Sequence, residues 1–155
     1  MDPDANVIRI GAGLGSLAFG ASMDEVRHYL GEPDECTEEL LGSSSSVSWS
    51  YTSRGIDAYF SAEDEFVLGT LRMESPNADL LGEKLIERPE AHVRSWLEHN
   101  LGKGKEELLE FSDHPSMLRI SYPEISTEFW FKFEKLDSII WSCLIGDDDQ
   151  VKWPR

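Results

Sequence analysis

The chain has 155 residues, with 30 Asp and Glu against 14 Lys and Arg, which gives a formal net charge of -16. Hydrophobic residues make up 40% and aromatic residues 10%, so the chain has enough apolar surface to fold. The charge disfavours binding to nucleic acid or to an anionic membrane and favours a cationic partner. We expect one globular domain over residues 1–155 that is monomeric when free.

The amino terminus is acidic from Met1 to Asn6, where a secretory signal would begin with basic residues and continue with an apolar run. No apolar stretch is long enough to cross a bilayer. We therefore expect a cytoplasmic protein without membrane contact. Cys36 falls in a polar acidic segment and Cys143 in a strand pattern, so a disulfide is not implied and two free thiols are expected.

Residues 7–10 are a short strand candidate, followed by a glycine-rich connection over residues 11–15. The dinucleotide-binding fingerprint requires glycine at its sixth place, where this chain has Ser16, so we interpret the glycines as a structural turn. Ser22 is expected to cap a helix, with Glu25 completing a capping box. The sequence predicts that this helix ends at Gly31.

Residues 32–39 are predicted to form an acidic loop that carries Glu35, Glu38 and Glu39. Strands with period-2 alternation follow, and in the second of them Asp57 and Tyr59 point away from the apolar set. A turn with Glu63 and Asp64 leads to a third strand over residues 68–73.

Residues 15–73 and 82–143 resemble two copies of one unit. Residues 19–30 match residues 86–97 without a gap, and residues 50–60 match residues 121–131 in the same way. This alignment places Glu128 and Trp130 at the positions of Asp57 and Tyr59. We predict repeat 1 over about 7–73, a linker over about 74–81, repeat 2 over about 82–145, and an acidic C-terminal tail over 146–155.

The predicted fold class is α+β: two tandem helix-plus-antiparallel-strand repeats that form one curved sheet with both helices on one face. Because alternate side chains of a strand point to opposite faces, the other face is left uncovered. Asp57, Tyr59, Glu128 and Trp130 are predicted to lie on it, where rings and acids suit a basic protein partner. The alternative is that these rings pack against each other or under a terminal segment.

The pattern Phe19-Gly20-x-Ser22-x-x-Glu25-Val26, followed by Tyr29-Leu30-Gly31-x-Pro33 and repeated loosely at 86–102, resembles the tandem unit of the β-lactamase inhibitor protein family and of related small envelope lipoproteins. The resemblance implies a sheet that grips a target enzyme. An acidic cytoplasmic module of this kind is also similar to the immunity proteins of bacterial toxins.

Neither zinc-ligand spacing, a calcium loop nor a nucleophile motif is found, so we expect no enzyme activity, no metal and no cofactor. The sequence therefore predicts an immunity or inhibitor protein that neutralises a cationic bacterial toxin, with a nuclease as one class. The alternative is a small-ligand or peptide-binding module on the open sheet face, favoured by a pocket among Trp49, Trp130 and Trp141. The candidate partner-binding residues are Glu35, Glu38, Glu39, Asp57, Tyr59, Glu63, Asp64, Glu128, Trp130, Asp147, Asp148 and Asp149.

Overall fold

The computed structural model describes residues 4–146, 148 and 150–154. This part of the chain contains two α-helices, α1 (Met23–Leu30) and α2 (Glu90–Leu101). Its strands are β1 (Val7–Arg9), β2 (Gly13–Leu14), β3 (Leu17–Ala18), β4 (Glu35–Glu39), β5 (Ser46–Tyr51), β6 (Ile56–Ser61), β7 (Leu68–Met73), β8 (Asp79–Leu80), β9 (Lys105–Leu109), β10 (Met117–Tyr122), β11 (Thr127–Lys132), β12 (Lys135–Ser142), β13 (Leu144–Ile145) and β14 (Val151–Lys152). Short 3-10 helices are η1 (Gly42–Ser44), η2 (Thr52–Arg54), η3 (Ala62–Asp64) and η4 (Pro123–Ile125).

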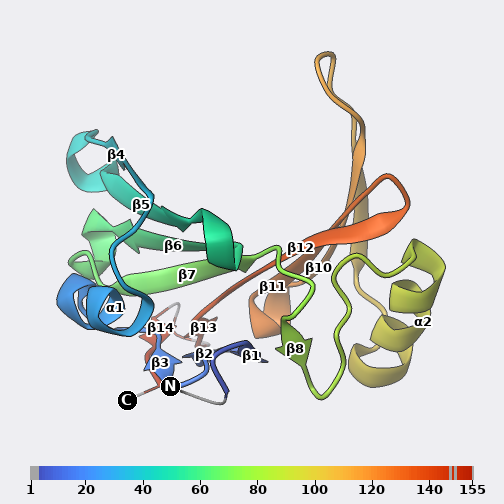
Figure 1. The fold of residues 1–155 in the computed structure, drawn as a ribbon, viewed down its shortest axis with the longest axis horizontal. Coiled ribbons are helices and arrows are strands. Elements are labelled where there is room, and N and C mark those ends of the chain that lie inside the picture. The colour runs from blue at the N-terminus through green and yellow to red at the C-terminus, as the bar shows by residue number, and fades with distance from the viewer. Residues whose placement is uncertain (1–3, 147, 149, 155) are drawn as a thin grey trace.

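The largest element is an eight-stranded antiparallel sheet with the order β4-β5-β6-β7-β12-β11-β10-β9. Strands β7 and β12 join its two halves, and β4 and β9 are its edges. The helices α1 and α2 lie at opposite ends of the molecule, and the β4–β5 and β9–β10 hairpins project upward on either side (Figure 1). One cross-strand row runs through all eight strands: Lys105, Ser121, Glu128, Ile140, Arg72, Asp57, Ser50 and Glu35.

Two smaller sheets complete the fold. The first has the order β3-β2-β1-β8, in which β1 pairs with β8 in parallel, Val7 opposite Asp79. The second is the hairpin of β13 and β14 near the C-terminus. A bridge between Gly11 and Cys143 links the N-terminal segment to the end of β12. The first and last strands, β1 and β14, therefore lie on the same side of the large sheet (Figure 1).

The predicted fold class is wrong. The chain is mainly β, with fourteen strands in three sheets and only two α-helices in the described residues, rather than an α+β fold of two tandem repeats with one curved sheet. The predicted acidic loop over 32–39 contains the strand β4, and the expected linker contains β8. Every residue of β4 is exposed, so period-2 alternation, which depends on one buried face, could not reveal it.

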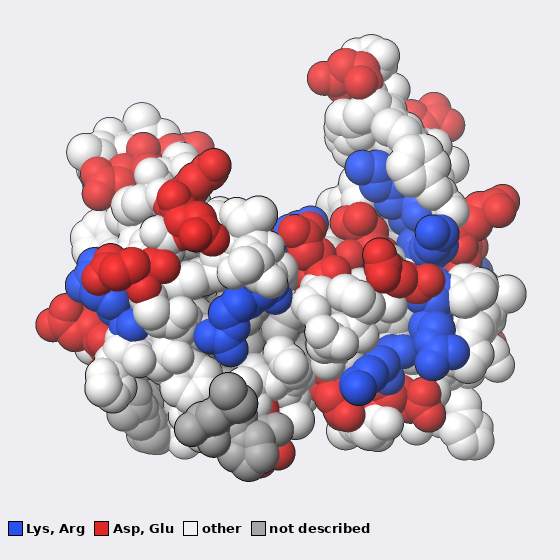
Figure 2. Space-filling model, viewed as in Figure 1, with Lys and Arg blue, Asp and Glu red and all other residues white. Residues whose placement is uncertain are grey.

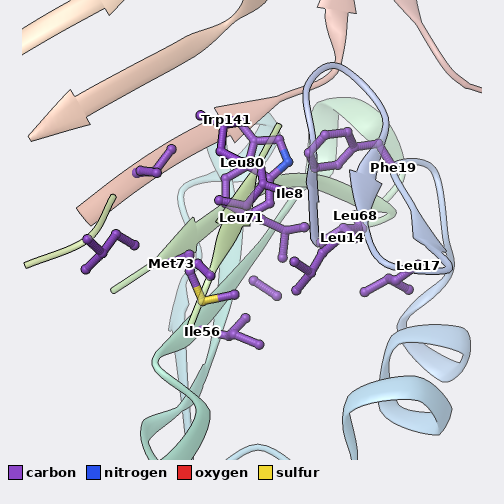
Figure 3. Packing of buried hydrophobic residues seen from close by; sticks show 14 of the residues in the cluster. Ile8, Leu14, Leu17, Phe19, Ile56, Leu68, Leu71, Met73, Leu80 and Trp141 are labelled. Carbon is purple, nitrogen blue, oxygen red and sulfur yellow. The ribbon is translucent and has the colours of Figure 1, made fainter. Parts of the chain in front are cut away.

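The core lies between the large sheet, the helices and the N-terminal strands. Trp141 of β12 is 1% exposed, and its indole Nε1 donates a hydrogen bond of 2.9 Å to the carbonyl oxygen of Gly13. Figure 3 shows Ile8, Leu14 and Phe19 of the N-terminal segment packed beside this ring and Leu71 of β7. Burying side chains of this size contributes roughly 1.5–3 kcal/mol each. The N-terminal segment thus completes the core of the large sheet.

Sequence signals set the start of α1 correctly. Ser22 accepts a hydrogen bond from the amide of Glu25, and the Glu25 carboxylate accepts one from the amide of Ser22, which confirms the predicted capping box. Val26 and Leu30 are the buried residues of this helix. In α2, Pro89 is the N-cap and the helix begins at Glu90.

Candidate functional site

The sheet face that points away from the core is polar and partly accessible, and we call it the open face. Strand pairing places the following residues on it: Thr37, Ser46, Ser48, Ser50, Asp57, Tyr59, Ser61, Thr70, Arg72, Arg119, Glu128 and Trp130. None of these residues is fully buried. Its β4–β7 half carries many hydroxyl groups, whereas the opposite half carries the Trp130 ring. This polar face is the first candidate for binding a partner.

Arg72 occupies the centre of the open face and holds three acids. Its guanidinium lies 3.0 Å from the Asp57 carboxylate, 3.1 Å from Glu74 and 3.5 Å from Asp137. Burial opposes the charged form of Arg72, but Glu74 and the hydrogen bonds to Asp57 and Glu74 outweigh it and raise the Arg72 pKa above its ordinary value. Asp57 is therefore engaged within the protein, in an ion pair with an arginine that it shares with two other acids.

Glu128 and Trp130 are likewise held within their own half of the sheet. The Trp130 indole Nε1 donates a hydrogen bond of 3.0 Å to the Glu128 carboxylate. The Arg119 guanidinium lies 5.5 Å from the centre of the Trp130 ring and also pairs with Glu107. Glu128 is thus oriented by the indole, and Trp130 presents a ring already covered by a cation.

Tyr59 is the accessible aromatic side chain of the β4–β7 half, with 36% of its surface exposed. It pairs across the strands with Ser48 and Thr70. Partial burial, reinforced by Asp57 and Glu74 and opposed by Arg72, raises the Tyr59 pKa above its ordinary value. Tyr59 and Thr70 also line a hollow of about 230 Å³ with Val151 and Trp153, so the C-terminal segment borders this ring, as the alternative interpretation allowed.

The predicted acids of β4 do not all face the same way. Glu35 and Glu39 pair with Ser50 and Ser46 on the open face, whereas Glu38 pairs with Val47, whose side chain is buried on the core side. The three carboxylates are exposed and have no ion-pair partner in the described residues. Glu35 and Glu39 can therefore contact a partner on the open face, and Glu38 cannot do so from the same side.

Glu63 and Asp64 lie in η3, next to Glu39. The amide of Ala62 donates to the carbonyl of Ser45 at 2.9 Å, and Ser46 pairs with both Glu39 and Ser61, which brings the two turns together. A surface hollow of about 720 Å³ beside η3 is lined by acids and by Trp153, and no Lys or Arg among the described residues lines it. We call the group Glu39, Glu63, Asp64 and Glu65 the acidic end.

Two residues of this region were not among the sequence candidates. Leu40 and Leu41 follow Glu39 directly and are 72% and 69% exposed. Two adjacent leucines in a polar stretch were visible in the sequence, but without the fold their exposure was not. They place apolar surface immediately beside the acidic end, which is the combination found at protein interfaces.

The remaining predicted acids belong to the C-terminal segment. Asp148 is exposed, and its carboxylate accepts a hydrogen bond of 3.1 Å from the amide of Gln150. Asp147 and Asp149 lie outside the described residues. The structure therefore does not assign these three acids to the acidic end.

Charge is unevenly distributed over the molecule. Residues 1–73 contain 13 Asp and Glu against four Arg and no Lys, whereas all six Lys lie from residue 84 onward. Figure 2 shows acidic side chains on both halves of this face, with a row of Lys and Arg side chains running down the half opposite β4–β7. Residues 74–155 contain the other 17 Asp and Glu and ten Lys and Arg, so both halves carry a net negative charge, and the first differs in having no Lys.

Several other features bear on function. No group of three potential metal ligands occurs among the residues that the structure describes. None of the helices in that part of the chain is long and apolar enough to cross a membrane. Cys36 is exposed and Cys143 is buried, and both are free thiols.

No protein-family model and no curated protein matches the chain. Among solved structures it is similar to a DUF4309 family protein (YjgB) from Bacillus subtilis subsp. subtilis str. 168, with 13% identity, a TM-score of 0.49, and coverage of 86% of this chain and 88% of that chain. It is also similar to an extracellular protein containing a SCP domain from Bacillus anthracis str. Ames, with 11% identity, a TM-score of 0.47, and coverage of 81% and 44%. At these values the likenesses carry no argument about function, and the resemblance to β-lactamase inhibitor proteins stays a prediction.

Proposed function

We propose that this chain is an inhibitor of the immunity type that binds and neutralises a cationic protein toxin, with a nuclease as the expected class. The interface consists of the acidic end, Glu35 at the outer edge of β4, and the hydroxyl-bearing part of the open face. The observation that carries the proposal is that the acids of the β4–β7 half fall into two groups, one paired with an arginine and one unpaired. Arg72 pairs with three acids at the centre of the sheet, whereas those of the acidic end have no ion-pair partner in the described residues.

Physical chemistry supports this division of roles. Exposed, unpaired carboxylates raise the association rate with a basic partner and select against acidic ones. Serine hydroxyls and the Tyr59 ring provide adaptable hydrogen bonds and rigid contact area, as in the paratopes of antibodies. Leu40 and Leu41 add apolar surface at the rim of the same region. A nuclease fits because the groove with which it binds phosphates must be cationic.

The alternative of a small-ligand module loses its main argument. Trp49 and Trp141 are buried on the core side of the sheet, with 3% and 1% of their surface exposed, whereas Trp130 lies on the open face. The three rings therefore do not line one pocket.

The test is co-expression of this chain with the product of the adjacent gene. We expect that product to be toxic alone and to form a complex with this chain. The triple variant Glu39→Lys, Glu63→Lys, Asp64→Lys should slow association about tenfold or more and weaken its dependence on salt. The matched control, Glu98→Lys, Glu110→Lys, Glu124→Lys, changes the net charge equally on the other half of the chain and should have a much smaller effect.

An adjacent product that is neither toxic nor bound by this chain would rule out the immunity proposal. If the two triple variants slowed association equally, only the net charge would matter and the acidic end would have no specific role.

A further inference from the structure

A third hollow lies where the two halves of the large sheet meet, away from the acidic end. It has a volume of about 490 Å³, which is within the range of roughly 300–1,000 Å³ typical of small-molecule sites. Three segments and Glu87, which precedes α2, line it: η2 with Gly55, the residues after β7, and the β11–β12 hairpin. The lining residues that matter here are Thr52, Ser53, Arg54, Glu74, Ser75, Glu87, Lys132, Lys135 and Asp137.

Two of the three acids in this lining share one arginine. Glu74 and Asp137 both pair with Arg72, at 3.1 Å and 3.5 Å. Glu87 is exposed and has no ion-pair partner in the described part of the chain. The lining therefore carries three acids and three cations, Arg54, Lys132 and Lys135, and two of the acids are held by Arg72, which is not part of the lining.

The three cations that line the hollow lack acidic partners. Among the described residues no ion pair involves Arg54, Lys132 or Lys135. The Lys132 ammonium lies 5.5 Å from the centre of the Phe133 ring. Arg54 is half-buried, which makes an uncompensated charge more costly than it would be on an open surface.

The two lysines also oppose each other directly across the hairpin. Lys132 and Lys135 are cross-strand partners, joined by Phe133 and Glu134 with positive φ values of 53° and 61°. Such a tight turn holds the strands in register, and like charges directly opposite each other destabilise a hairpin. An anion between the ammonium groups removes this repulsion.

The opposite wall of the hollow is held by close backbone packing. Gly55 adopts a left-handed conformation with φ of 66°, and a Cβ there would lie 2.9 Å from the amide nitrogen of Ser75. Its carbonyl accepts a hydrogen bond of 2.8 Å from the amide of Glu74. The segments that carry the hydroxyl groups of Thr52, Ser53 and Ser75 are thus held together on this wall.

We propose that this hollow binds a small polyanion, a molecule rich in phosphate or carboxylate oxygens, between Arg54 and the lysine pair Lys132 and Lys135. The site is separate from the surface that receives a cationic protein, and it does not depend on that function. Its ligand has the opposite charge to that partner. Glu87 at the rim opposes the ligand and limits its affinity.

The experiment is an NMR titration of the free, isotope-labelled chain with pyrophosphate and, separately, with citrate. We expect saturable amide shifts confined to residues 52–55, 74–76 and 132–136. Preference for pyrophosphate identifies a phosphate ligand, and preference for citrate a carboxylate ligand.

Variants make the test specific. Lys132→Gln with Lys135→Gln should weaken binding about tenfold or more through lost charge-assisted hydrogen bonds, and Glu87→Gln should strengthen it. The matched control, Lys103→Gln with Lys105→Gln, should bind as the unaltered chain does. Because the substitutions at 132 and 135 remove a repulsion, urea unfolding should show no loss of stability. Absence of saturable shifts with either anion, or equal weakening in the lysine control, would overturn the proposal.

Discussion

The hydroxyl of Tyr51 donates a hydrogen bond of 3.0 Å to the carbonyl oxygen of Gly31, the residue that ends α1. Tyr122 does the same to Gly102, the residue that ends α2, also at 3.0 Å. Each bond links the end of a helix to the last residue of a strand, β5 or β10. Because a helix leaves its last carbonyls without partners inside the helix, these hydroxyls satisfy one of them and fix the helix to the sheet.

Replacing Tyr51 by Phe should lower the free energy of unfolding by about 1 kcal/mol, because the Gly31 carbonyl then loses its partner. Tyr122→Phe should have a similar effect at Gly102. The two sites belong to different halves of the sheet, so the double variant should show the sum of the two losses. Urea unfolding measures the free energies of all three variants. A double variant no less stable than either single variant would contradict the independence of the two hydrogen bonds.

Alkaline pH should destabilise the protein through the same tyrosine. Burial, reinforced by Glu32 and Asp34 and opposed by Arg27 and Arg54, raises the pKa of Tyr51 from 10.0 to about 12. The folded state therefore holds this proton more tightly than the unfolded state does. The resulting stability is complete below pH 10 and is lost as the pH rises from 10 to about 12, by an amount on the order of 2 kcal/mol. Unfolding measured against pH should show this slope, and Tyr51→Phe should reduce it.

Arg72→Met should destabilise the centre of the open face. Asp57, Glu74 and Asp137 would then repel one another without the guanidinium that now lies within 3.5 Å of each. We expect a loss of about 1–3 kcal/mol near neutral pH, the range for hydrogen bonds to charged groups. The loss should shrink in acid, where carboxylates take up protons. Equal destabilisation at both pH values would instead indicate lost packing of the arginine stem.

The two cysteines should react differently with a thiol reagent. Cys36 is exposed on β4, whereas Cys143 is buried, burial raises its pKa, and its Sγ lies 2.8 Å from the carbonyl oxygen of Lys152. Because the thiolate is the reactive form, only Cys36 should be labelled in the folded protein. Mass spectrometry after labelling with and without denaturant checks this, and rapid labelling of Cys143 in the folded state would show that the C-terminal segment does not cover it.

The sequence was informative where one face of an element is buried. The alternation around Trp49 and Phe129 found the central strands, and Ser22 with Glu25 marked the start of α1. Edge strand β4 carries no such pattern because both of its faces are exposed, and for this reason the sequence predicts a loop there. The pairing of β1 with β8 depends on contacts between residues far apart in the chain, which local pattern cannot show. For these reasons the fold class was wrong.

The candidate site was partly predictable for a similar reason. Period-2 alternation placed Asp57 and Glu128 on one face, and the strand pairing puts them in the same cross-sheet row. It could not show that Arg72 and the Trp130 indole already engage these two carboxylates, because that depends on which strands are neighbours. The alternation also could not show that Glu38 and Glu35 point to opposite faces of the sheet, since the sequence predicts a loop for both.

The most direct test of the proposed interface is amide hydrogen exchange of this chain, alone and with the adjacent gene product. We expect slower exchange on binding in residues 35–41, 46–50 and 57–65, which carry the acidic end and the hydroxyl-bearing part of the open face. Helix α2 and strand β9 should exchange as they do in the free protein. Protection confined to α2 and β9, or no protection at all when the two proteins are mixed, would contradict it.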